Sequence, residues 1–341
     1  MLEIDGGDGG GQILRTALAL SMVTDTPVEV TDIRGSRPTP GLRPQHLAGV
    51  RVAEAVSDAN VSGAAVGATD LTFVPDEPSG GDYHADIGTA GSVTLLFETL
   101  LPLATTLDEP LTLTATGGTD VKWSPTAAYY ERVKLQLLAR FGLDARLTLH
   151  RSGFYPAGGG KATLRLAPSS LSSIELTERG PLERVVVRSK ASTSLENRSV
   201  AVRQAAAAEK RLAELGVDYA VEQPVYVPAT SPGSALLLEA RYANGLVGFD
   251  ALGERGKSSE EVADEAVDAF EAFRTTAAAV DEQLADQVML PLALAGGEVR
   301  IPRVTAHVRT NLAAIRAFGL DLSLSEAGDG TALLTAPGHD E

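Results

Sequence analysis

The chain has 341 residues, a formal net charge of −16 and a hydrophobic content of 44%, which is typical of a globular protein with one large domain or a few smaller ones. It contains no cysteine, which excludes disulfides, thiolate metal sites and a cysteine nucleophile, and which fits a cytoplasmic protein. The N-terminus lacks a basic-then-apolar signal segment and no apolar run reaches about 18 residues, so we expect neither export nor a membrane partner.

The charge of the chain has an unusual make-up. Its 29 basic residues include only six lysines, against 45 carboxylates. This composition predicts a halophilic protein that stays soluble in concentrated salt, where the Debye length is ~3 Å at 1 M. The net charge therefore does not exclude a nucleic-acid partner. Three basic stretches without any carboxylate indicate contact with anions, with chance clustering as the competing interpretation for each: residues 33–53, 145–174 and 299–320.

A glycine-rich loop follows the short apolar segment at residues 1–4. Five glycines fall between Gly6 and Gly11, directly before an apolar-periodic run that predicts a helix over residues 12–24. Such a loop can bring backbone N–H groups close to an anion. The phosphate-binding motif GxxxxGK[ST] fails because Gln12 stands in place of the lysine, and GxGxxG does not fit either. A tight turn between strand and helix is the competing interpretation.

Further along the chain, the same order of elements is predicted three times: helix, strand, helix, strand, strand. With a strand before each first helix, this order predicts an α/β (α+β) fold of three βαβαββ modules around a common core. The first module has helices 12–24 and 44–59 and strands 28–33, 64–66 and 71–74; the second has helices 92–107 and 125–141 and strands 111–116, 145–149 and 161–166; the third has helices 280–294 and 310–318 and strands 298–304, 321–325 and 331–335.

The third module is interrupted by about 90 residues of compact α/β pattern, which is long enough for a small inserted domain. We therefore predict a large three-module domain over residues 1–184 and 276–338, an inserted domain over residues 185–275, and a polar tail at residues 339–341. The elements expected in the insertion are strands 185–190, 219–222, 235–242 and 247–251 and helices 200–215 and 259–273.

Few residues are candidates for chemistry. Among the five histidines, His46 follows an arginine-rich loop, and His307 lies where the third module turns from strand to helix, in a loop position that favours a catalytic role. His84, His150 and His339 are expected to be ordinary surface residues. The absence of HExxH and GxSxG argues against a metalloprotease and an α/β-hydrolase. Asp8, Glu98 and Asp286 could hold Mg²⁺ beside phosphate, or could be ordinary solvated carboxylates.

Several motifs in one order carry a resemblance. Taken together they resemble the RNA 3′-terminal phosphate cyclases over essentially the whole chain. This resemblance implies a fold of three modules, each similar to the C-terminal domain of a bacterial translation initiation factor, with a small inserted domain. The motifs are Gly9-Gly-Gly-Gln-Ile-Leu-Arg15, Ile33-Arg34, Pro40-Gly-Leu-Arg-Pro-Gln-His46, Gly80-Gly-Asp-Tyr83, Gly88-Thr-Ala-Gly-Ser92, Gly117-Gly-Thr-Asp120, His150-Arg-Ser-Gly-Phe-Tyr-Pro-Ala-Gly-Gly-Gly160, Leu284-Ala-Asp-Gln287 and Pro291-Leu-Ala-Leu-Ala-Gly296.

The resemblance implies an enzyme, a ligase, that uses ATP with Mg²⁺ or Mn²⁺ to convert an RNA 3′-phosphate to a 2′,3′-cyclic phosphate through a histidine–AMP adduct and an RNA-adenylate. His307 matches the nucleophile of the family. Asp8 stands where the family commonly has glutamate and is a candidate metal ligand. Residues matching the ATP site are Glu98, where the family commonly has glutamine, and Gln283, Leu284, Ala285, Asp286 and Gln287; those expected to cradle phosphate are Arg15, Arg34, Arg37, Arg43, Gln45 and His46.

Two other classes of protein share this kind of fold. Cyclase-like ribosome-assembly proteins lack the nucleophile, and the presence of His307 argues against them. Enolpyruvyl transferases use a related repeat, but the lysine-poor composition and the single insertion disfavour this interpretation. Fold alone does not decide function.

Overall fold

The computed structural model describes residues 1–338, and the predicted tail 339–341 with His339 lies outside this range. The described residues form three four-stranded sheets of identical topology. In each sheet the first two strands are parallel and the other neighbours are antiparallel. The spatial orders are β1-β2-β4-β3, β5-β6-β8-β7 and β9-β15-β17-β16. The prediction of three βαβαββ modules is confirmed.

The first module comprises β1 (Leu2–Asp5), α1 (Gly11–Val23), β2 (Val28–Thr31), α2 (Pro44–Val56), β3 (Asn60–Ser62) and β4 (Leu71–Val74). The second comprises β5 (Gly81–Asp86), α3 (Val93–Leu100), β6 (Leu111–Gly117), α4 (Ala127–Tyr129), α5 (Leu135–Ala139), β7 (Ala145–Arg151) and β8 (Gly160–Leu166). The third comprises β9 (Ile174–Leu176), α8 (Glu282–Gln287), α9 (Met289–Ala295), β15 (Gly297–Ile301), α10 (Ala306–Ala317), β16 (Ser323–Glu326) and β17 (Ala332–Ala336).

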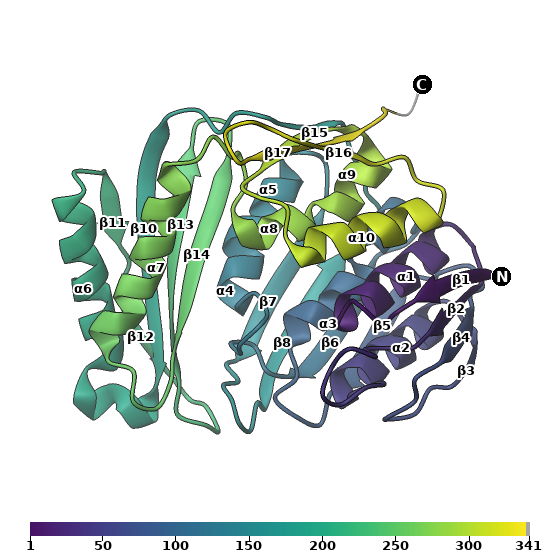
Figure 1. The fold of residues 1–341 in the computed structure, drawn as a ribbon. Helices are drawn as coiled ribbons and strands as arrows, with labels where there is room; N and C mark the ends of the chain where they lie inside the picture. The colour runs from purple at the N-terminus through teal and green to yellow at the C-terminus, as the bar shows by residue number, and fades with distance from the viewer. Residues whose placement is uncertain (339–341) are drawn as a thin grey trace.

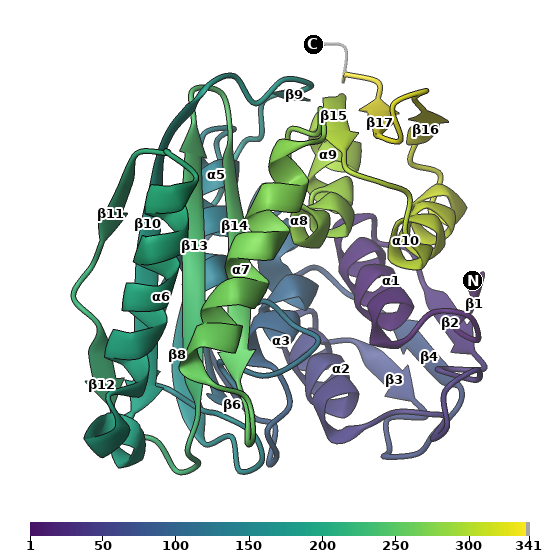
Figure 2. The same ribbon diagram turned by 60° about the vertical axis from the view of Figure 1, so that its left-hand side comes forward.

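The helices of the three modules meet at the centre of the molecule (Figures 1 and 2). Leu18 of α1, Phe97 of α3 and Leu292 of α9 are fully or almost fully buried in one shared hydrophobic cluster. Because each helix presents its apolar face to the others, burial of this face favours the common core that the sequence predicts.

A fourth sheet lies between β9 and α8 along the chain and occupies the left of Figure 1. Its hydrophobic cluster is separate and includes Leu236 and Phe270, whereas Leu237 and Leu246 pack into the main core. The domain boundaries at residues 185 and 275 stay a prediction. The unit comprises β10 (Leu182–Ser192), α6 (Val200–Glu214), β11 (Tyr219–Val221), β12 (Val225–Val227), β13 (Ser234–Tyr242), β14 (Leu246–Gly253) and α7 (Ser259–Arg274).

Several element bounds differ from the predictions. The strand expected at residues 64–66 is β3 at Asn60–Ser62, because Gly63 and Gly67 take positive φ values of 82° and 86° and form a turn. The helix expected at 92–107 changes to a 3-10 helix, Leu101–Thr105, which contains Pro102. The helix expected at 125–141 contains a π-helical segment, Tyr130–Lys134, between α4 and α5. The helix expected at 280–294 is divided at Val288 into α8 and α9.

Among residues 1–338, no helix is both long enough and apolar enough to cross a membrane.

Candidate active site

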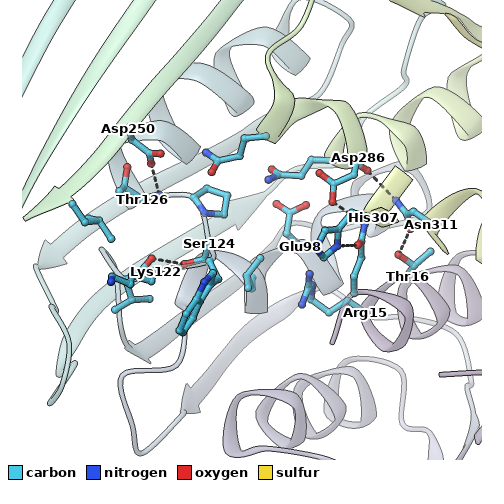
Figure 3. A pocket seen from close by; sticks show the side chains of 18 of the residues that line it. Arg15, Thr16, Glu98, Lys122, Ser124, Thr126, Asp250, Asp286, His307 and Asn311 are labelled. Carbon is cyan, nitrogen blue, oxygen red and sulfur yellow. Dashed lines mark hydrogen bonds between the residues drawn. The ribbon is translucent and has the colours of Figure 1, made fainter. Parts of the chain in front are cut away.

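A cleft of about 450 Å³ opens where helices of all three modules meet the fourth sheet. Figure 3 shows Asp250 and Thr126 on one side of it and Asp286, His307 and Asn311 on the other. The lining residues come from four separated parts of the chain: Gln12, Arg15, Thr16 and Ala19; Leu95, Glu98 and Val121–Thr126; Asp250, Leu252, Glu254, Lys257 and Glu265; and Gln283, Asp286, Gln287, Leu290, His307 and Asn311.

His307 lies in the first turn of α10 and not in a loop. The helix begins four residues earlier than predicted because Thr305 caps it, with the Thr305 hydroxyl accepting a hydrogen bond of 3.2 Å from the Val308 N–H. The helix therefore fixes the position of an exposed imidazole at the edge of the cleft.

Gln12 connects His307 to Asp286. The Gln12 amide nitrogen donates a hydrogen bond of 2.8 Å to the Asp286 carboxylate. Its carbonyl oxygen, which can only accept, is therefore the atom that bonds Nδ1 of His307. Nδ1 must carry the ring proton, and Nε2 of a neutral ring keeps a free lone pair. The contacts thus select the tautomer in which Nε2 is the nucleophilic nitrogen.

A second layer of hydrogen bonds lies one helical turn further along both helices. The Thr16 hydroxyl donates to the Asn311 side-chain oxygen over 2.6 Å, and the Asn311 amide donates to the Asp286 backbone oxygen over 2.9 Å. Because residues four apart share one face of a helix, α1 and α10 face each other through two matched pairs. This second layer joins α1 to α10 beside the Gln12–His307 contact.

A buried cationic group pairs with Glu98, one of the residues that line the cleft. Lys134 and Glu98 form an ion pair whose lysine is 1% exposed. Burial lowers the pKa of Lys134, and the Glu98 carboxylate opposes this effect. Burial likewise lowers the pKa of Arg15, against the charges of Glu98 and Asp286. For Asp286, burial raises the pKa and His307, Arg15 and Lys134 lower it. The attraction between these buried cations and carboxylates thus opposes the effect of burial on their pKa values.

Helix α8 presents only part of its predicted nucleotide-binding run to the cleft. Gln283, Asp286 and Gln287 line it because positions i, i+3 and i+4 share a helix face, whereas the Leu284 and Ala285 side chains are buried in the core. Three buried polar atoms of the cleft have no hydrogen-bond partner among the described residues: Glu98 Oε1, Gln283 Nε2 and Gln287 Oε1. Such atoms indicate a polar ligand, since leaving them unpaired is costly.

The arginine-rich loop before α2 gathers beside the glycine-rich loop. A Cβ on Gly10 would lie 3.1 Å from the Arg37 guanidinium, and one on Gly11 would collide with the His46 ring. The Arg43 N–H donates a 3.1 Å hydrogen bond to His46 Nδ1. Burial, followed by the charges of Arg15, Arg34 and Arg43, lowers the pKa of His46 to about 3. Three of the predicted phosphate contacts, Arg15, Arg34 and Arg43, therefore lie near the neutral imidazole of a fourth, His46, and Arg37 lies beside the glycine-rich loop.

Gln45 has a structural partner. Its side-chain oxygen accepts a 2.7 Å hydrogen bond from the Ser92 N–H, which ties α2 to the loop before α3. Any phosphate contact of Gln45 would use its amide nitrogen. Arg34 donates to the backbone oxygens of Thr39 and Gly41, at 2.7 and 2.9 Å, and so shapes the loop itself.

The protein-family model described as RNA 3′-terminal phosphate cyclase matches residues 6–321 of this chain. The chain belongs to the RNA 3′-terminal phosphate cyclase family. Three relatives with this name are similar to it: one from Halobacterium salinarum, 42% identical over 98% of this chain and 100% of the relative; one from Caldivirga maquilingensis, 42% identical over 93% and 92%; and one from Methylococcus capsulatus, 41% identical over 97% and 95%.

Two arginines close to His307 in the sequence of this cyclase-family chain are paired with carboxylates. The carboxylate-free stretch 299–320, which is predicted to contact anions, contains both Arg303 and Arg309. Arg303 instead pairs with Glu282 at 2.6 and 2.9 Å, and Arg309 pairs with Glu326 at 3.1 Å. Partners distant in sequence neutralise both charges, so the stretch is not a basic surface.

The carboxylates do not form a ready-made metal site. Residues 1–338 contain no group of three or more histidine or carboxylate side chains that could hold an ion. Asp8 is exposed and is not among the cleft residues, so its role as a metal ligand stays a prediction. Glu98 Oε1 is buried, unpaired and in the cleft, which fits one protein ligand to a Mg²⁺ or Mn²⁺ held mainly by phosphate oxygens.

Sequence reasoning missed the roles of several cleft residues of this cyclase-family chain. Gln12, Lys134 and Asn311 make contacts that no local pattern reveals, although Gln12 lies in a quoted motif. The contribution of the fourth sheet, through Asp250 and Glu254, was also missed. These residues were recognisable only as polar residues at otherwise apolar helix or strand positions.

Proposed function

We propose that this protein is an ATP-dependent enzyme that converts an RNA 3′-terminal phosphate to a 2′,3′-cyclic phosphodiester. The observation that carries the proposal is the orientation of His307 by Gln12 in the cleft, with the Nε2 lone pair free for attack. The family and the names of the relatives support the same activity. A cytoplasmic location and adaptation to concentrated salt, inferred from composition, belong to the same proposal.

The proposed chemistry has three steps. The lone pair of His307 Nε2 attacks the α-phosphorus of ATP, the bond to the β-phosphate oxygen breaks, and pyrophosphate leaves. An oxygen of the RNA 3′-phosphate then attacks the same phosphorus, so that the N–P bond breaks and an RNA-adenylate forms. The 2′-hydroxyl finally attacks the 3′-phosphorus, loses its proton and expels AMP. The result is the cyclic phosphodiester and a free imidazole.

The residues of the cleft fit these steps. Arg15 supplies a positive charge beside His307, where negative charge gathers on the phosphates, and the unpaired amide atoms of Gln283 and Gln287 offer one donor and one acceptor to a nucleoside. The proposed phosphate cradle consists of Arg34, Arg37, Arg43, Gln45 and His46 next to the glycine-rich loop. Mg²⁺ or Mn²⁺ would arrive with the ATP phosphates and neutralise their charge, with Glu98 and Asp8 as candidate ligands.

Intact-protein mass spectrometry tests the proposal. After incubation with ATP and Mg²⁺ or Mn²⁺, we expect a mass increase of one AMP that is lost in acid and retained in base, as expected for a phosphoramidate. His307→Asn should abolish the adduct in a folded protein, and His46→Asn should retain some labelling. An adduct that persists in the His307 variant or maps to another residue would falsify the assignment.

A second assay separates the enzyme from a non-catalytic relative. An RNA with a 3′-phosphate should become resistant to phosphatase after incubation with ATP, because its terminal phosphate becomes a diester. No observation of this structure favours the non-catalytic alternative. An RNA-binding protein without the activity would leave the RNA fully sensitive to phosphatase.

A further inference from the structure

The outer face of the second sheet carries an unusual set of cations. In the antiparallel pair β7–β8, Arg146 lies directly opposite Arg165, and Arg151 lies directly opposite Lys161. All four residues are exposed. Like charges directly opposite each other on one sheet face are destabilising. Within the chain, the Arg151 guanidinium donates a hydrogen bond to the Gly159 backbone oxygen, but no such bond offsets the repulsion between Arg146 and Arg165.

The surrounding carboxylates do not neutralise these charges. No ion pair to a carboxylate forms at Arg151, Lys161 or Arg165 within residues 1–338, and Arg146 approaches only Asp144, at 3.9 Å between highly exposed side chains. Residues 299–320 differ, because Arg303 and Arg309 pair there with the carboxylates of Glu282 and Glu326, at 2.6 and 3.1 Å. In a chain with 45 carboxylates, an unneutralised cluster indicates an external anion.

Hydroxyl groups continue the cationic face across the sheet. Thr163 of β8 bonds both His150 and Thr114, at 2.8 and 2.9 Å. The only carboxylates of the same sheet that lie on this face within the described chain, Asp82 and Asp86, are on the far edge strand β5. The cationic half of the face is thus separated from them by the threonines of β6.

One end of the cationic face is connected to the cleft through the chain. Lys161 pairs with Thr116 at the end of β6, and the chain continues from there into residues 121–126, which line the cleft. Four residues along β8, Arg165 lies about 13 Å further away at the usual rise of a strand. The second sheet therefore extends its positive charge outward from the site that would hold the RNA end.

We propose that the β7–β8 face, defined by Arg146, Arg151, Lys161 and Arg165, binds phosphates in the body of the RNA upstream of its 3′-terminal phosphate. The proposal rests on the proposed function, since it assumes RNA as the substrate. Lysine and arginine contacts to backbone phosphates give affinity and register but no base specificity. The face therefore distinguishes long RNA from short RNA and does not read sequence.

Lys161→Ala combined with Arg165→Ala tests the proposal, with Arg140→Ala combined with Arg198→Ala as the charge-matched control. Both control arginines are exposed and lie outside the β7–β8 face. Dissociation constants are measured by fluorescence anisotropy over a series of KCl concentrations for 3′-phosphate RNAs of about 3 and about 20 nucleotides. A single-strand contact contributes about −0.7 to the slope of the logarithm of the association constant against log salt, so the test variant should reduce the magnitude of this slope by about 1.4 for the long RNA.

We expect the test variant to bind the long RNA roughly tenfold more weakly, while the short RNA and the control variant change less than about twofold. ATP-dependent labelling of His307 should be unchanged, and the melting temperature should not fall because repulsion is relieved. An equal loss in both variants, or no loss for the long RNA, overturns the proposal. If the wild-type protein neither forms the AMP adduct nor cyclises the short RNA, the proposed function itself fails, and the two failures are thus distinguishable.

Discussion

Gln12 lies 295 positions before His307, and its side-chain carbonyl oxygen holds the Nδ1 proton of the His307 imidazole. This contact joins the first helix of the first module to the last helix of the third. His307, the proposed nucleophile, is therefore oriented by a residue whose own amide is fixed by Asp286. Orientation of this kind lowers the entropic cost of reaching the transition state.

Replacing Gln12 by alanine should slow AMP transfer to His307 by roughly 10- to 100-fold, which corresponds to about 1.4–2.7 kcal/mol. The imidazole would lose the acceptor that selects its tautomer, but would stay in the cleft. Thr16→Val is the matched control, because it removes the second-layer bond to Asn311 at a stability cost of about 1 kcal/mol without touching the ring. Rapid-quench labelling with α-labelled ATP measures both rates. Equal rates in the two variants would contradict the role of Gln12.

The Lys134–Glu98 ion pair predicts a stability effect. Lys134→Met should lower the free energy of unfolding by about 3–5 kcal/mol, because it leaves the Glu98 carboxylate in a site with little water and without a counter-charge. The double variant Lys134→Met with Glu98→Gln should recover most of this loss, since no charge is then uncompensated. Denaturant unfolding of the wild type and the variants checks this. A double variant less stable than Lys134→Met would argue against it.

Because His46 is held neutral in the folded protein, we expect the free energy of unfolding to depend on pH. Its folded pKa of about 3 is far below the ordinary 6.5, so the folded state binds fewer protons than the unfolded state between these values. The contribution of His46 to the free energy of unfolding is therefore fully present above pH 6.5. It decreases as the pH falls towards 3, by up to about 1.4 kcal/mol per pH unit.

The His46→Gln variant isolates this effect, because its neutral amide can still accept the Arg43 N–H but does not titrate. Urea unfolding at pH 7 and pH 4 should show the wild type losing more stability than the variant on acidification. If the wild type and the variant differ in free energy of unfolding by the same amount at pH 7 and at pH 4, His46 is not held neutral.

Arg43 should contact phosphate and not bases. Its exposed side chain has no carboxylate partner among the described residues, and Arg43→Ala should cost on the order of 1.5–3 kcal/mol of binding or transition-state energy. Cyclisation rates of several 3′-phosphate RNAs with different terminal bases are compared with binding of the 3′-hydroxyl RNAs. A loss confined to one base identity would indicate base recognition instead.

The carboxylate excess should make stability depend on salt. The 45 acidic residues repel one another at low ionic strength, and molar KCl screens this repulsion. Thermal unfolding from low to multimolar KCl should show a rising melting temperature. A melting temperature that stays flat or falls with salt would rule out the halophilic interpretation.

The fold was predictable from the sequence because each repeated element has a recognisable local pattern of apolar residues and glycines. Apolar periodicity identified the helices around Leu18 and Phe97, and glycines marked the loops before the first two modules. The strand expected at 64–66 was misplaced because Gly63 and Gly67 were not recognised as turn residues. Helix α10 was predicted too short because its first turn has no apolar periodicity and its start depends on the Thr305 cap.

The site was less predictable because its contacts join distant parts of the chain. Helix periodicity could have separated Gln283 and Asp286 from Leu284, since only one face of α8 can reach a cleft. No local pattern, however, shows that Glu282 neutralises Arg303. The contact between Gln12 and His307 likewise depends on how whole modules pack together.

The span of the cleft along the chain has a consequence for protein synthesis. The cleft residues begin at Gln12 and end at Asn311, and the fourth sheet supplies one wall before α8 and α10 supply the others. A chain emerging from the ribosome lacks His307, the proposed nucleophile, and the wall opposite Gln12 until the third module has left the exit tunnel. Contacts of such long sequence separation form slowly. ATP-dependent labelling of His307 would thus report completed folding, and partly synthesised chains would not consume ATP.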